Sequence, residues 1–164
     1  MTRHELLDED MRARAWTDFV LSYNHLMAVL EQEMRDGAGL TLSQYDVLLR
    51  LGEVPGGRMK MSDLADAVLY STGGLTRLIE RMCQAGLVRR EPSEADRRVI
   101  YAVLTGEGRD RLRTASVLHM AGVRRHFGSV LGDDEAGTVA AFLGRLHASA
   151  RSCGGAKKSP FTSP

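Results

Sequence analysis

Residues 61–104 read MSDLADAVLYSTGGLTRLIERMCQAGLVRREPSEADRRVIYAVL, and the rest of the chain is organised around them. Apolar residues recur at spacings of three and four in two short segments, 62–68 and 72–85, which indicates two amphipathic helices. Two β-prone segments follow, the first opening at residue 87 and the second spanning 99–104. Helix, turn, helix and a two-stranded ribbon together form the plan of a winged helix-turn-helix.

Residues at the ends of these segments support the two helices. Ser62 is expected to cap the first helix, because its hydroxyl oxygen can accept a hydrogen bond from a backbone amide of the first turn. Ser71 or Thr72 can cap the second helix in the same way, and Gly86 stands where a glycine often ends a helix. The apolar side of the second helix consists of Leu75, Leu78, Ile79 and Met82, and its polar side of Thr76, Arg77, Glu80, Arg81 and Gln84.

Gly73 and Gly74 are unusual at the start of a helix, because a glycine costs about 1 kcal/mol relative to alanine in a helix interior. One interpretation is functional: without side chains, the helix N-terminus can approach a phosphate, where free amides and the helix dipole favour an anion. The other interpretation is simple tolerance of glycine in a frayed first turn. The sequence leaves both interpretations open.

A charged turn, residues 91–98, joins the β-prone segments and is longer than most hairpin loops, which is typical of a functional loop. Arginines flank this turn, and a guanidinium group binds phosphate through two hydrogen bonds and fits a narrow minor groove. After a capped helix-turn-helix, this pattern predicts DNA contact, with the second helix in the major groove. A solvated charged hairpin and a winged helix that binds protein are the alternatives. The predicted DNA contacts are Ser71, Thr72, Gly73, Thr76, Arg77, Arg81, Arg97 and Arg98.

Helical patterns also flank this stretch on its N-terminal side. A long amphipathic helix is expected over residues 8–35, ended by Gly37 and Gly39. The next helix opens at residue 42 with Ser43 as its cap, and Gly52 with the following Pro-Gly-Gly closes it.

A candidate strand directly precedes the stretch, and two further helical patterns follow it. Residues 58–60 are a candidate third strand beside the ribbon, and Thr105 is expected to cap a long helix that reaches about residue 130. Residues 132–134 interrupt the pattern, and a last helix is expected over 134–150.

Charge is distributed unevenly along the 164 residues, which suggest one domain able to fold unaided. The formal net charge is +1, yet residues 97–125 contain seven arginines against Glu107 and Asp110, so one face can be basic. Two cysteines form no disulfide framework, and no apolar run reaches transmembrane length. We therefore expect a cytoplasmic protein with no membrane partner.

The charged turn ends in DRR at residues 96–98, and LTGEG follows at residues 104–108. These sequences resemble the Asp-x-Arg and Leu-Thr-x-x-Gly motifs at the wing of the multiple-antibiotic-resistance regulator (MarR) family. The sequences LSQYDVLLRL, MSDLADAV and TRLIERM also fall where that family has its second, third and recognition helices. The resemblance covers about residues 12–150.

The resemblance implies a mainly α, six-helix protomer with a wing sheet of two to three strands, no enzymatic activity and no cofactor. Such a protein regulates transcription, here expected as a repressor, by binding a palindromic operator in double-stranded DNA as a homodimer. In the family, the residue that matches Asp96 pairs with the second following arginine and orients the wing. The expected units are an N-terminal dimerisation helix at 8–36, a winged helix-turn-helix at 40–104, C-terminal dimerisation helices at 105–151 and a disordered tail at 152–164.

Dimerisation is also expected from the residues themselves, because the first and last helices carry apolar faces outside the DNA-binding unit. A single helix-turn-helix reads a palindrome only as part of a two-fold dimer. The alternative is that these helices cover one another within one chain. The apolar faces include Phe19, Tyr23, Phe142, Leu143 and Leu146.

A small aromatic ligand is implied by the resemblance, because family members bind such compounds between the dimerisation helices and the DNA-binding unit. The ligand would release DNA by changing the spacing of the two recognition helices. The alternative is that Trp16 and Tyr23 belong to the core. The candidate ligand-binding residues are Trp16, Tyr23, His25, Tyr45 and Arg50.

Other chemistries have weaker signals. The sequence contains no glycine-rich phosphate loop of suitable spacing and no His-Glu-x-x-His motif, which argues against an enzyme. His119 and His126 can share a helix face, but no acidic or cysteine ligand lies in register, so no metal site is expected. A cysteine-based redox regulator remains an alternative, although Cys83 is expected to be a small packed residue and Cys153 lies in the tail.

Overall fold

The computed structural model describes residues 11–68 and 71–153, and in these ranges it contains six α-helices, two short 3-10 turns and a small sheet. The mainly α architecture with a winged helix-turn-helix is confirmed. In chain order the elements are α2 (Met11–Ala38), α3 (Leu42–Glu53), η1 (Pro55–Gly57), β1 (Arg58–Lys60), α4 (Met61–Ala67), α5 (Thr72–Gln84), β2 (Val88–Pro92), β3 (Ile100–Leu104), α6 (Gly106–His126), η2 (Gly128–Val130) and α7 (Asp133–Cys153).

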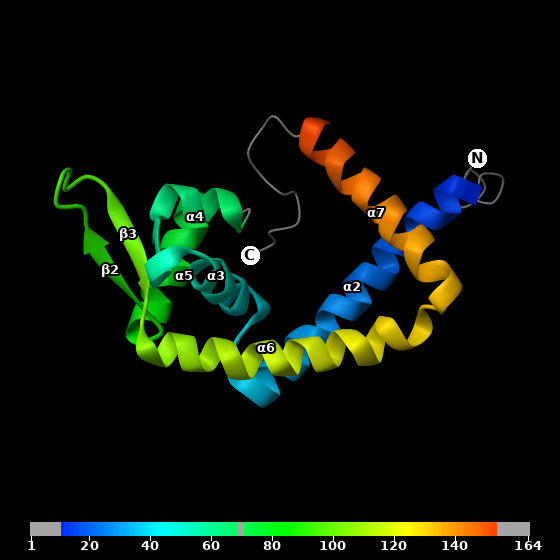
Figure 1. The fold of residues 1–164 in the computed structure, drawn as a ribbon, viewed down its shortest axis with the longest axis horizontal. Coiled ribbons are helices and arrows are strands. Elements are labelled where there is room, and N and C mark those ends of the chain that lie inside the picture. The colour runs from blue at the N-terminus through cyan, green and yellow to red at the C-terminus, as the bar shows by residue number, and fades with distance from the viewer. Residues whose placement is uncertain (1–10, 69–70, 154–164) are drawn as a thin grey trace.

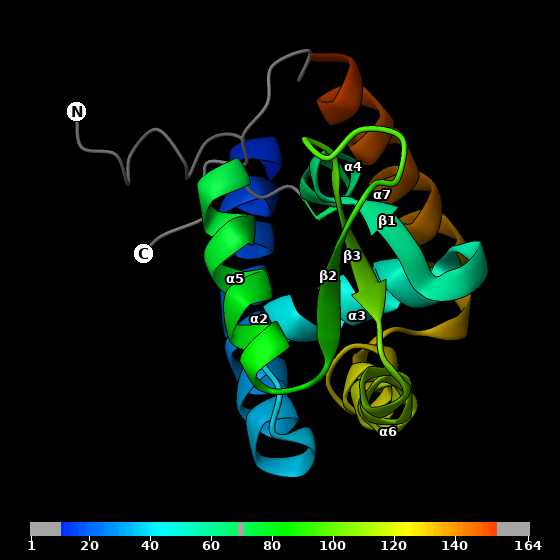
Figure 2. The ribbon, with the colours of Figure 1, turned by 90° about the vertical axis from the view of Figure 1, so that its left-hand side faces the viewer.

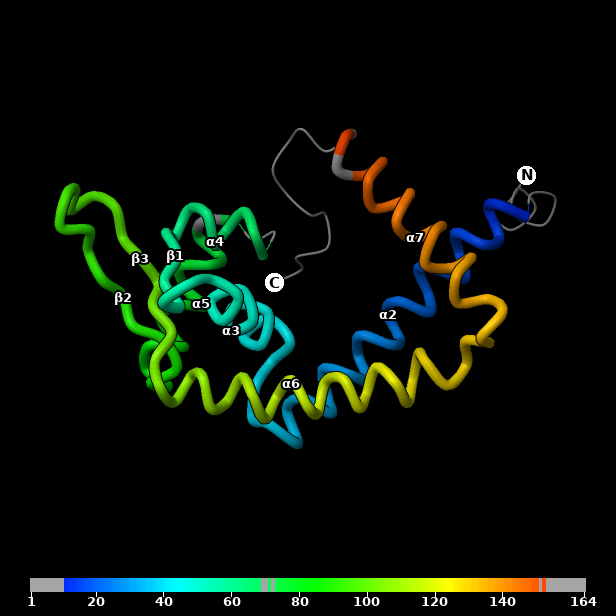
Figure 3. Tube along the Cα trace, in the orientation of Figure 1, coloured from blue at the N-terminus to red at the C-terminus, as the bar shows by residue number. Residues whose placement is uncertain are grey.

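The molecule is elongated, and α6 runs along most of its length (Figure 1). The helix-turn-helix and the β2–β3 hairpin lie at one end of α6, whereas α7 and the N-terminal part of α2 lie at the other end (Figure 3). The path of the chain thus places the helix-turn-helix and the terminal helices at opposite ends of α6.

The sheet has the strand order β1-β3-β2, and both pairings are antiparallel. Arg58 pairs with Val103 and Lys60 with Tyr101, which confirms the predicted third strand at residues 58–60. This short strand leads directly into α4, so the sheet and the helix-turn-helix form one unit.

One hydrophobic core joins α3, α4, α5 and the sheet, and side chains from α2 and α6 complete it. Leu48, Leu64, Ile79 and Ala102 are fully buried in it, one from each of these four elements. The apolar stripes predicted from periodicity in the second helix of the motif are all buried, because α5 packs its apolar side inward.

Two polar contacts fix the C-terminal end of α2. The carboxylate of Glu31 accepts a hydrogen bond from the backbone N–H of Leu42 at 2.7 Å and pairs with Arg35 at 2.7 Å. Arg111 of α6 donates to the carbonyl oxygen of Ala38 at 2.9 Å, which satisfies one of the carbonyl groups left free at a helix end. These contacts connect α2 to both α3 and α6.

Two predicted helix caps were wrong. Thr41, rather than Ser43, caps α3: its hydroxyl accepts from the backbone N–H of Gln44, whose side chain accepts in turn from the N–H of Thr41. Ser62 does not cap α4, because β1 leads into this helix without a break and leaves Lys60 in the cap position. The hydroxyl of Ser62 donates to Asp63 instead.

Two glycines predicted to stop helices lie inside them. A Cβ atom at Gly37 would lie 2.6 Å from a methyl carbon of Leu118, and one at Gly52 would lie 2.6 Å from a methyl carbon of Leu112. Both glycines therefore allow α6 to pack closely against α2 and α3. Other helix ends also differ from the expected ones: α6 ends at His126, and α7 spans Asp133–Cys153. Residues 8–10 and most of the expected tail lie outside the described part of the chain.

Candidate nucleic-acid interface

Helix α5 presents a polar surface at the end of the molecule. The hydroxyl oxygen of Ser71 accepts from the backbone N–H of Gly74 at 3.2 Å, so the predicted cap of α5 is confirmed. Arg77 and Arg81 are exposed on the side opposite the buried stripe, and Thr76 is half-buried beside them. The buried stripe holds the helix in place while its charged side faces solvent.

The C-terminal end of α5 is tied to α6. Gly86 has a φ of 71°, the left-handed conformation that commonly ends helices at glycine. The hydroxyl of Thr105 lies 2.7 Å from the carbonyl oxygen of Gly86 and accepts from the N–H of Gly108 at 2.9 Å. A Cβ at Gly108 would lie 2.0 Å from the carbonyl oxygen of Leu87, so this glycine allows α6 to begin directly beneath the start of β2.

The loop between β2 and β3, residues 93–99, is organised by Asp96. Its carboxylate accepts from the backbone N–H of Arg98 at 3.0 Å, and its carbonyl oxygen accepts from the N–H of Val99 at 2.9 Å. Ser93 then closes the loop by donating its N–H to Val99 at 2.8 Å. Asp96 thus shapes the loop through the main chain of Arg98. Its carboxylate contact differs from the side-chain pairing that the family resemblance implied.

Arginines at the base of the hairpin are engaged by acidic neighbours. Glu91 pairs with Arg89 at 2.6 Å and with Arg58 at 3.5 Å, while the Arg58 guanidinium lies 3.6 Å from the centre of the Tyr101 ring. Arg90 lies 4.0 Å from the Glu80 carboxylate.

The predicted DNA-contacting arginines differ from those at the base. Within the described ranges, no carboxylate lies at ion-pair distance from Arg77, Arg81, Arg97 or Arg98, and all four are exposed. Unpaired cations of this kind are free to neutralise an external anion. The structure thus separates arginines paired with carboxylates from exposed arginines that have no such partner among the described residues.

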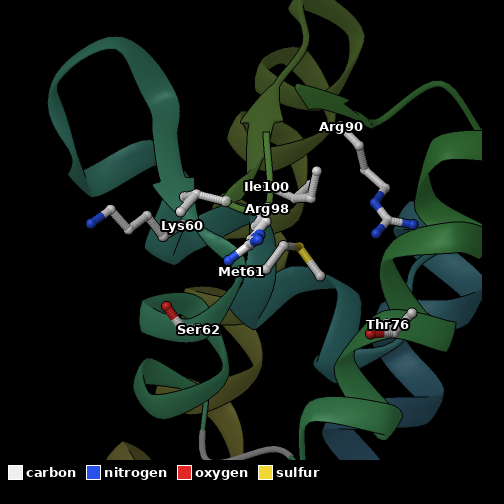
Figure 4. A pocket seen from close by; sticks show the side chains of 8 residues that line it. Lys60, Met61, Ser62, Thr76, Arg90, Arg98 and Ile100 are labelled. Carbon is white, nitrogen blue, oxygen red and sulfur yellow. The ribbon is translucent and has the colours of Figure 1, made fainter. Parts of the chain in front are cut away.

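Helix α5 and the hairpin lie side by side at the same end of the molecule (Figure 2). A cavity of about 350 Å³ lies where the junction of β1 and α4 meets α5 and the hairpin, and its lining side chains are seen in Figure 4. Three of its eight lining residues are cationic, and none is acidic. The lining residues are Lys60, Met61, Ser62, Thr76, Arg90, Arg98, Val99 and Ile100.

The predicted DNA-contacting residues lie in or next to α5 and in the 93–99 loop, and α5 and the hairpin are neighbours at one end of the molecule. Among the described residues, no atom lies within 4 Å of a Cβ placed at Gly73, so no packing contact there requires a glycine. Thr72 begins α5, but its side chain lies outside the described part. Sequence reasoning missed Lys60, whose place beside the hairpin follows from the pairing of β1 with β3.

The candidate ligand-binding residues fall into two groups. On α2, Trp16, Tyr23 and His25 are exposed, with 57% and 49% exposure for the first two, so neither belongs to the core. On α3, Tyr45 is buried with its ring centre 4.9 Å from that of His119, and Arg50 pairs with acidic neighbours on its own helix. The core alternative is therefore wrong for Trp16 and Tyr23.

The two histidines of α6 lie in different environments. Burial lowers the pKa of His119, whose Nδ1 is buried without a hydrogen-bond partner. Nε2 of His126 lies 2.8 Å from Glu33, and this hydrogen bond, with the charges of His126 and Arg125, lowers the pKa of the Glu33 carboxyl. Among the described residues, no group of three or more His, Cys, Asp or Glu side chains is arranged to hold a metal ion.

Cys83 is half-buried against the core and its thiol has a raised pKa, because burial outweighs the nearby charge of Arg90. A redox-active cysteine usually has a lowered pKa, which makes the thiolate available. Across the described part of the chain, no helix has the combined length and hydrophobicity needed to span a bilayer.

Known proteins share this fold and sequence pattern. The MarR family model matches residues 38–99. AbsC, a MarR family transcriptional regulator from Streptomyces coelicolor, is 37% identical, with a TM-score of 0.80 over 87% of this chain and 96% of AbsC.

Two further relatives are similar over different lengths. Another Streptomyces coelicolor MarR family regulator, solved in complex with DNA, is 26% identical with a TM-score of 0.77, over 92% of each chain. The transcriptional regulator HosA from Escherichia coli is 36% identical over 76 residues, which span 46% of this chain and 55% of HosA. From the helix-turn-helix, the hairpin and these similarities together, we conclude that the chain belongs to the MarR family of DNA-binding transcriptional regulators.

Proposed function

We propose that this protein is a repressor that binds a palindromic operator as a homodimer, with α5 in the major groove and the 93–99 loop in the adjacent minor groove. The observation that supports this most is that α5 and the hairpin lie side by side and carry exposed arginines with no carboxylate at ion-pair distance within the described ranges. A helix fits the major groove of B-DNA, and arginine is favoured in a narrow minor groove.

The polar side of α5 offers two kinds of contact. Arg77 lies in the N-terminal half of α5, the part of a recognition helix that reaches base edges, so it is proposed to read a guanine. Arg81 lies one turn further on and is proposed to contact a phosphate. Ser71, Gly73 and Thr76 are proposed to approach the DNA at the start of the helix.

The dimer is proposed to form through α2 and α7. None of the described side chains of α7 is buried, and Phe142 is 50% exposed. Trp16, Phe19 and Tyr23 form an exposed row of rings on α2, with centre-to-centre distances of 6.2 and 6.5 Å along the row. Exposed apolar surface of this extent commonly marks an interface between proteins.

A small aromatic or phenolic ligand is proposed to release the operator. Trp16, Tyr23 and His25 on one side and Tyr45 and Arg50 on the other would border its site in the dimer. Since α2 is tied to α3 through Glu31, a shift of α2 would move the helix-turn-helix. A ligand that prefers a misaligned dimer by a few kcal/mol is sufficient to release DNA.

Operator binding tests the main proposal. Duplexes would be selected from random sequence with the purified full chain, and affinity measured by fluorescence anisotropy across salt concentrations. We expect a palindromic consensus, an altered consensus for Arg77→Ala, and a uniform loss with a shallower salt slope for Arg81→Ala. Absence of salt-dependent binding to any duplex would favour a winged helix that binds protein.

The ligand proposal is tested with a panel of phenolic and lipophilic aromatic acids. An active compound should quench Trp16 fluorescence and lower operator affinity over the same concentration range. Release of DNA by thiol oxidants alone, with the whole panel inactive, would favour the cysteine-based alternative.

A further inference from the structure

We propose that Glu31 and Arg111 are positioning residues that decide which distance between two operator half-sites the dimer accepts. This inference rests on the proposed binding of a palindrome by a homodimer. The two side chains hold the turn between α2, through which the dimer is proposed to form, and α3, which shares the core of the helix-turn-helix. They act through this turn and not through contact with DNA.

The connection between the two helices is short. Residues 39–41 alone join α2 to α3, and the turn lies beside α6 (Figure 1). Gly39 has a φ of 64°, the left-handed conformation in which helices commonly end at glycine. Leu40 is buried in the core, and Thr41 caps α3. A connection of this length leaves little slack, so its stiffness decides how strictly α3 follows α2.

A charged side chain holds the main chain on each side of the turn. The carboxylate of Glu31 accepts a hydrogen bond at 2.7 Å from the N–H of Leu42, the first residue of α3. From α6, Arg111 donates at 2.9 Å to the carbonyl oxygen of Ala38, the last residue of α2. The first N–H groups and the last carbonyl groups of a helix have no partner within it. Both contacts therefore satisfy groups that the helices leave free.

The signs of the two charges suit the helix ends that they meet. A helix has a partial positive charge at its N-terminus and a partial negative charge at its C-terminus. The anionic Glu31 meets the start of α3, and the cationic Arg111 meets the end of α2. Each side chain is itself held, since Arg35 pairs with Glu31 at 2.7 Å and Glu107 accepts from Arg111 at 3.1 Å. Hydrogen bonds with a charged partner are among the stronger ones in proteins.

Packing around the turn is close but apolar. A Cβ at Gly37 would lie 2.6 Å from a methyl carbon of Leu118, and one at Gly52 equally close to a methyl carbon of Leu112. Hydrophobic contact is non-directional, so helices packed in this way can slide slightly at small cost. Hydrogen bonds require defined angles. The two charged contacts at the turn therefore oppose a motion that the apolar packing allows.

The stiffness of this turn has a consequence for operator choice. Adding one base pair between two half-sites moves one of them by about 3.4 Å and rotates it by about 35°. A stiff turn keeps each DNA-binding unit in one place relative to α2, so the altered spacing costs affinity. A loose turn accepts several spacings. It also lowers affinity for the best operator, because the aligned arrangement becomes a smaller fraction of the population.

The test measures affinity against half-site spacing. The selected operator, and duplexes with one or two base pairs added or removed between its half-sites, would be titrated with the full chain. The unchanged chain should lose at least about tenfold in affinity at one base pair from the natural spacing. Glu31→Ala and Arg111→Ala should each lose less than about threefold, relative to their own affinity at the natural spacing. Glu31→Gln and Arg111→Lys, which keep an acceptor and a donor, should lie between.

Two control variants remove the same kinds of charge from the same helices. Asp36→Ala removes a carboxylate that accepts from Gln32 within α2, and Arg113→Ala removes a cation that pairs with Asp110 within α6. Both should keep the spacing preference of the unchanged chain. A variant that is merely less stable loses affinity for every duplex by the same factor, so the ratio between spacings separates positioning from stability. Chemical denaturation identifies such variants.

An unchanged spacing preference in all four variants of the two positioning residues would overturn the inference. So would an equal loss of preference in the controls, or a dimer of the unchanged chain that tolerates every spacing. If the alanine variants do not fold, the milder pair decides, and a preference equal to that of the unchanged chain overturns the inference. In each case the proposed function survives where two chains still bind each palindrome. Independent binding of single chains to half-sites would instead contradict the proposed dimer.

Discussion

The two ends of the molecule differ in the side chains that they expose. At the end with α5 and the hairpin, the large apolar side chains are buried and the exposed side chains are mostly polar or charged. At the end with α7 and the start of α2, large apolar side chains remain exposed and no described side chain of α7 is buried. The first end thus offers unpaired arginines to an anionic partner, whereas the second end leaves apolar side chains uncovered in the single chain.

The largest effect is expected at the apolar end. Phe142→Glu combined with Leu146→Glu places charges on the exposed face of α7, which we propose is covered by a second copy. Burial of one such side chain contributes roughly 1.5–3 kcal/mol, so four of them across two copies outweigh most single contacts. We expect sedimentation velocity to show a monomer or aggregate in place of a dimer, with operator affinity lost.

Arg145→Glu is the matched control, because it changes the charge of the same helix by the same amount at an exposed position. It should remain a dimer. A stable monomer from the unchanged chain, or an intact dimer from the double variant, would show that α7 does not form the interface.

The next effect is expected in the 93–99 loop. Arg97→Ala and Arg98→Ala should each weaken operator binding by roughly 1–3 kcal/mol, because both remove an unpaired cation from the DNA-facing surface. Asp96→Ala should also weaken binding, although Asp96 touches only the loop backbone. Anisotropy titrations at physiological salt, with Arg89→Ala as the control, measure these losses. Unchanged affinity in all three variants would remove the loop from the interface.

A smaller effect, opposite in sign for folding and binding, is expected at Gly73. An alanine Cβ there has no atom of the described residues within 4 Å, so the substitution should stabilise the helix by up to about 1 kcal/mol in chemical denaturation. The same methyl group should weaken operator binding if α5 approaches the DNA backbone closely. Gly106→Ala, in the first turn of α6 and equally free of neighbours, should change stability without changing binding. Unchanged DNA affinity in Gly73→Ala would support simple tolerance of glycine at this turn.

The smallest effect concerns His119 of α6, whose ring contacts that of Tyr45 on α3. Burial lowers the pKa of His119 below its usual 6.5, so the unfolded chain binds a proton more readily than the folded one. Stability from this residue is present above pH 6.5 and decreases as the pH falls below that value. His119→Gln should therefore show a smaller loss of thermal stability between pH 7.5 and 5.5 than the unchanged chain, with His147→Gln as an exposed control. Equal losses in all three proteins would contradict this origin.

Local patterns predicted most of the DNA-binding end. The buried stripe of α5, its Ser71 cap, the turn at Gly86 and the Thr105 cap all depend on residues close together in sequence, and the structure confirms each of them. Residues 58–60 are also a candidate third strand from the sequence, and their pairing with β3 confirms it.

Contacts between distant residues explain what was missed. Gly37 and Gly52 looked like helix ends, but their role depends on Leu118 and Leu112 in a later helix. The caps at Ser43 and Ser62 failed because the first turn of each helix began elsewhere, and only the paired Thr41 and Gln44 side chains reveal where α3 starts. The place of Lys60 in the cavity depends on strand register, which no local pattern specifies.

Sedimentation of the full chain with its selected operator tests both ends together. A labelled palindromic duplex would be titrated with protein in the analytical ultracentrifuge at low and high salt. We predict that two chains bind each duplex in one step, that no complex with a single chain accumulates, and that raising the salt dissociates the DNA while leaving the protein dimer intact. Independent binding of single chains, or a complex whose affinity does not depend on salt, would contradict the division of the molecule into a DNA-binding end and a dimerising end.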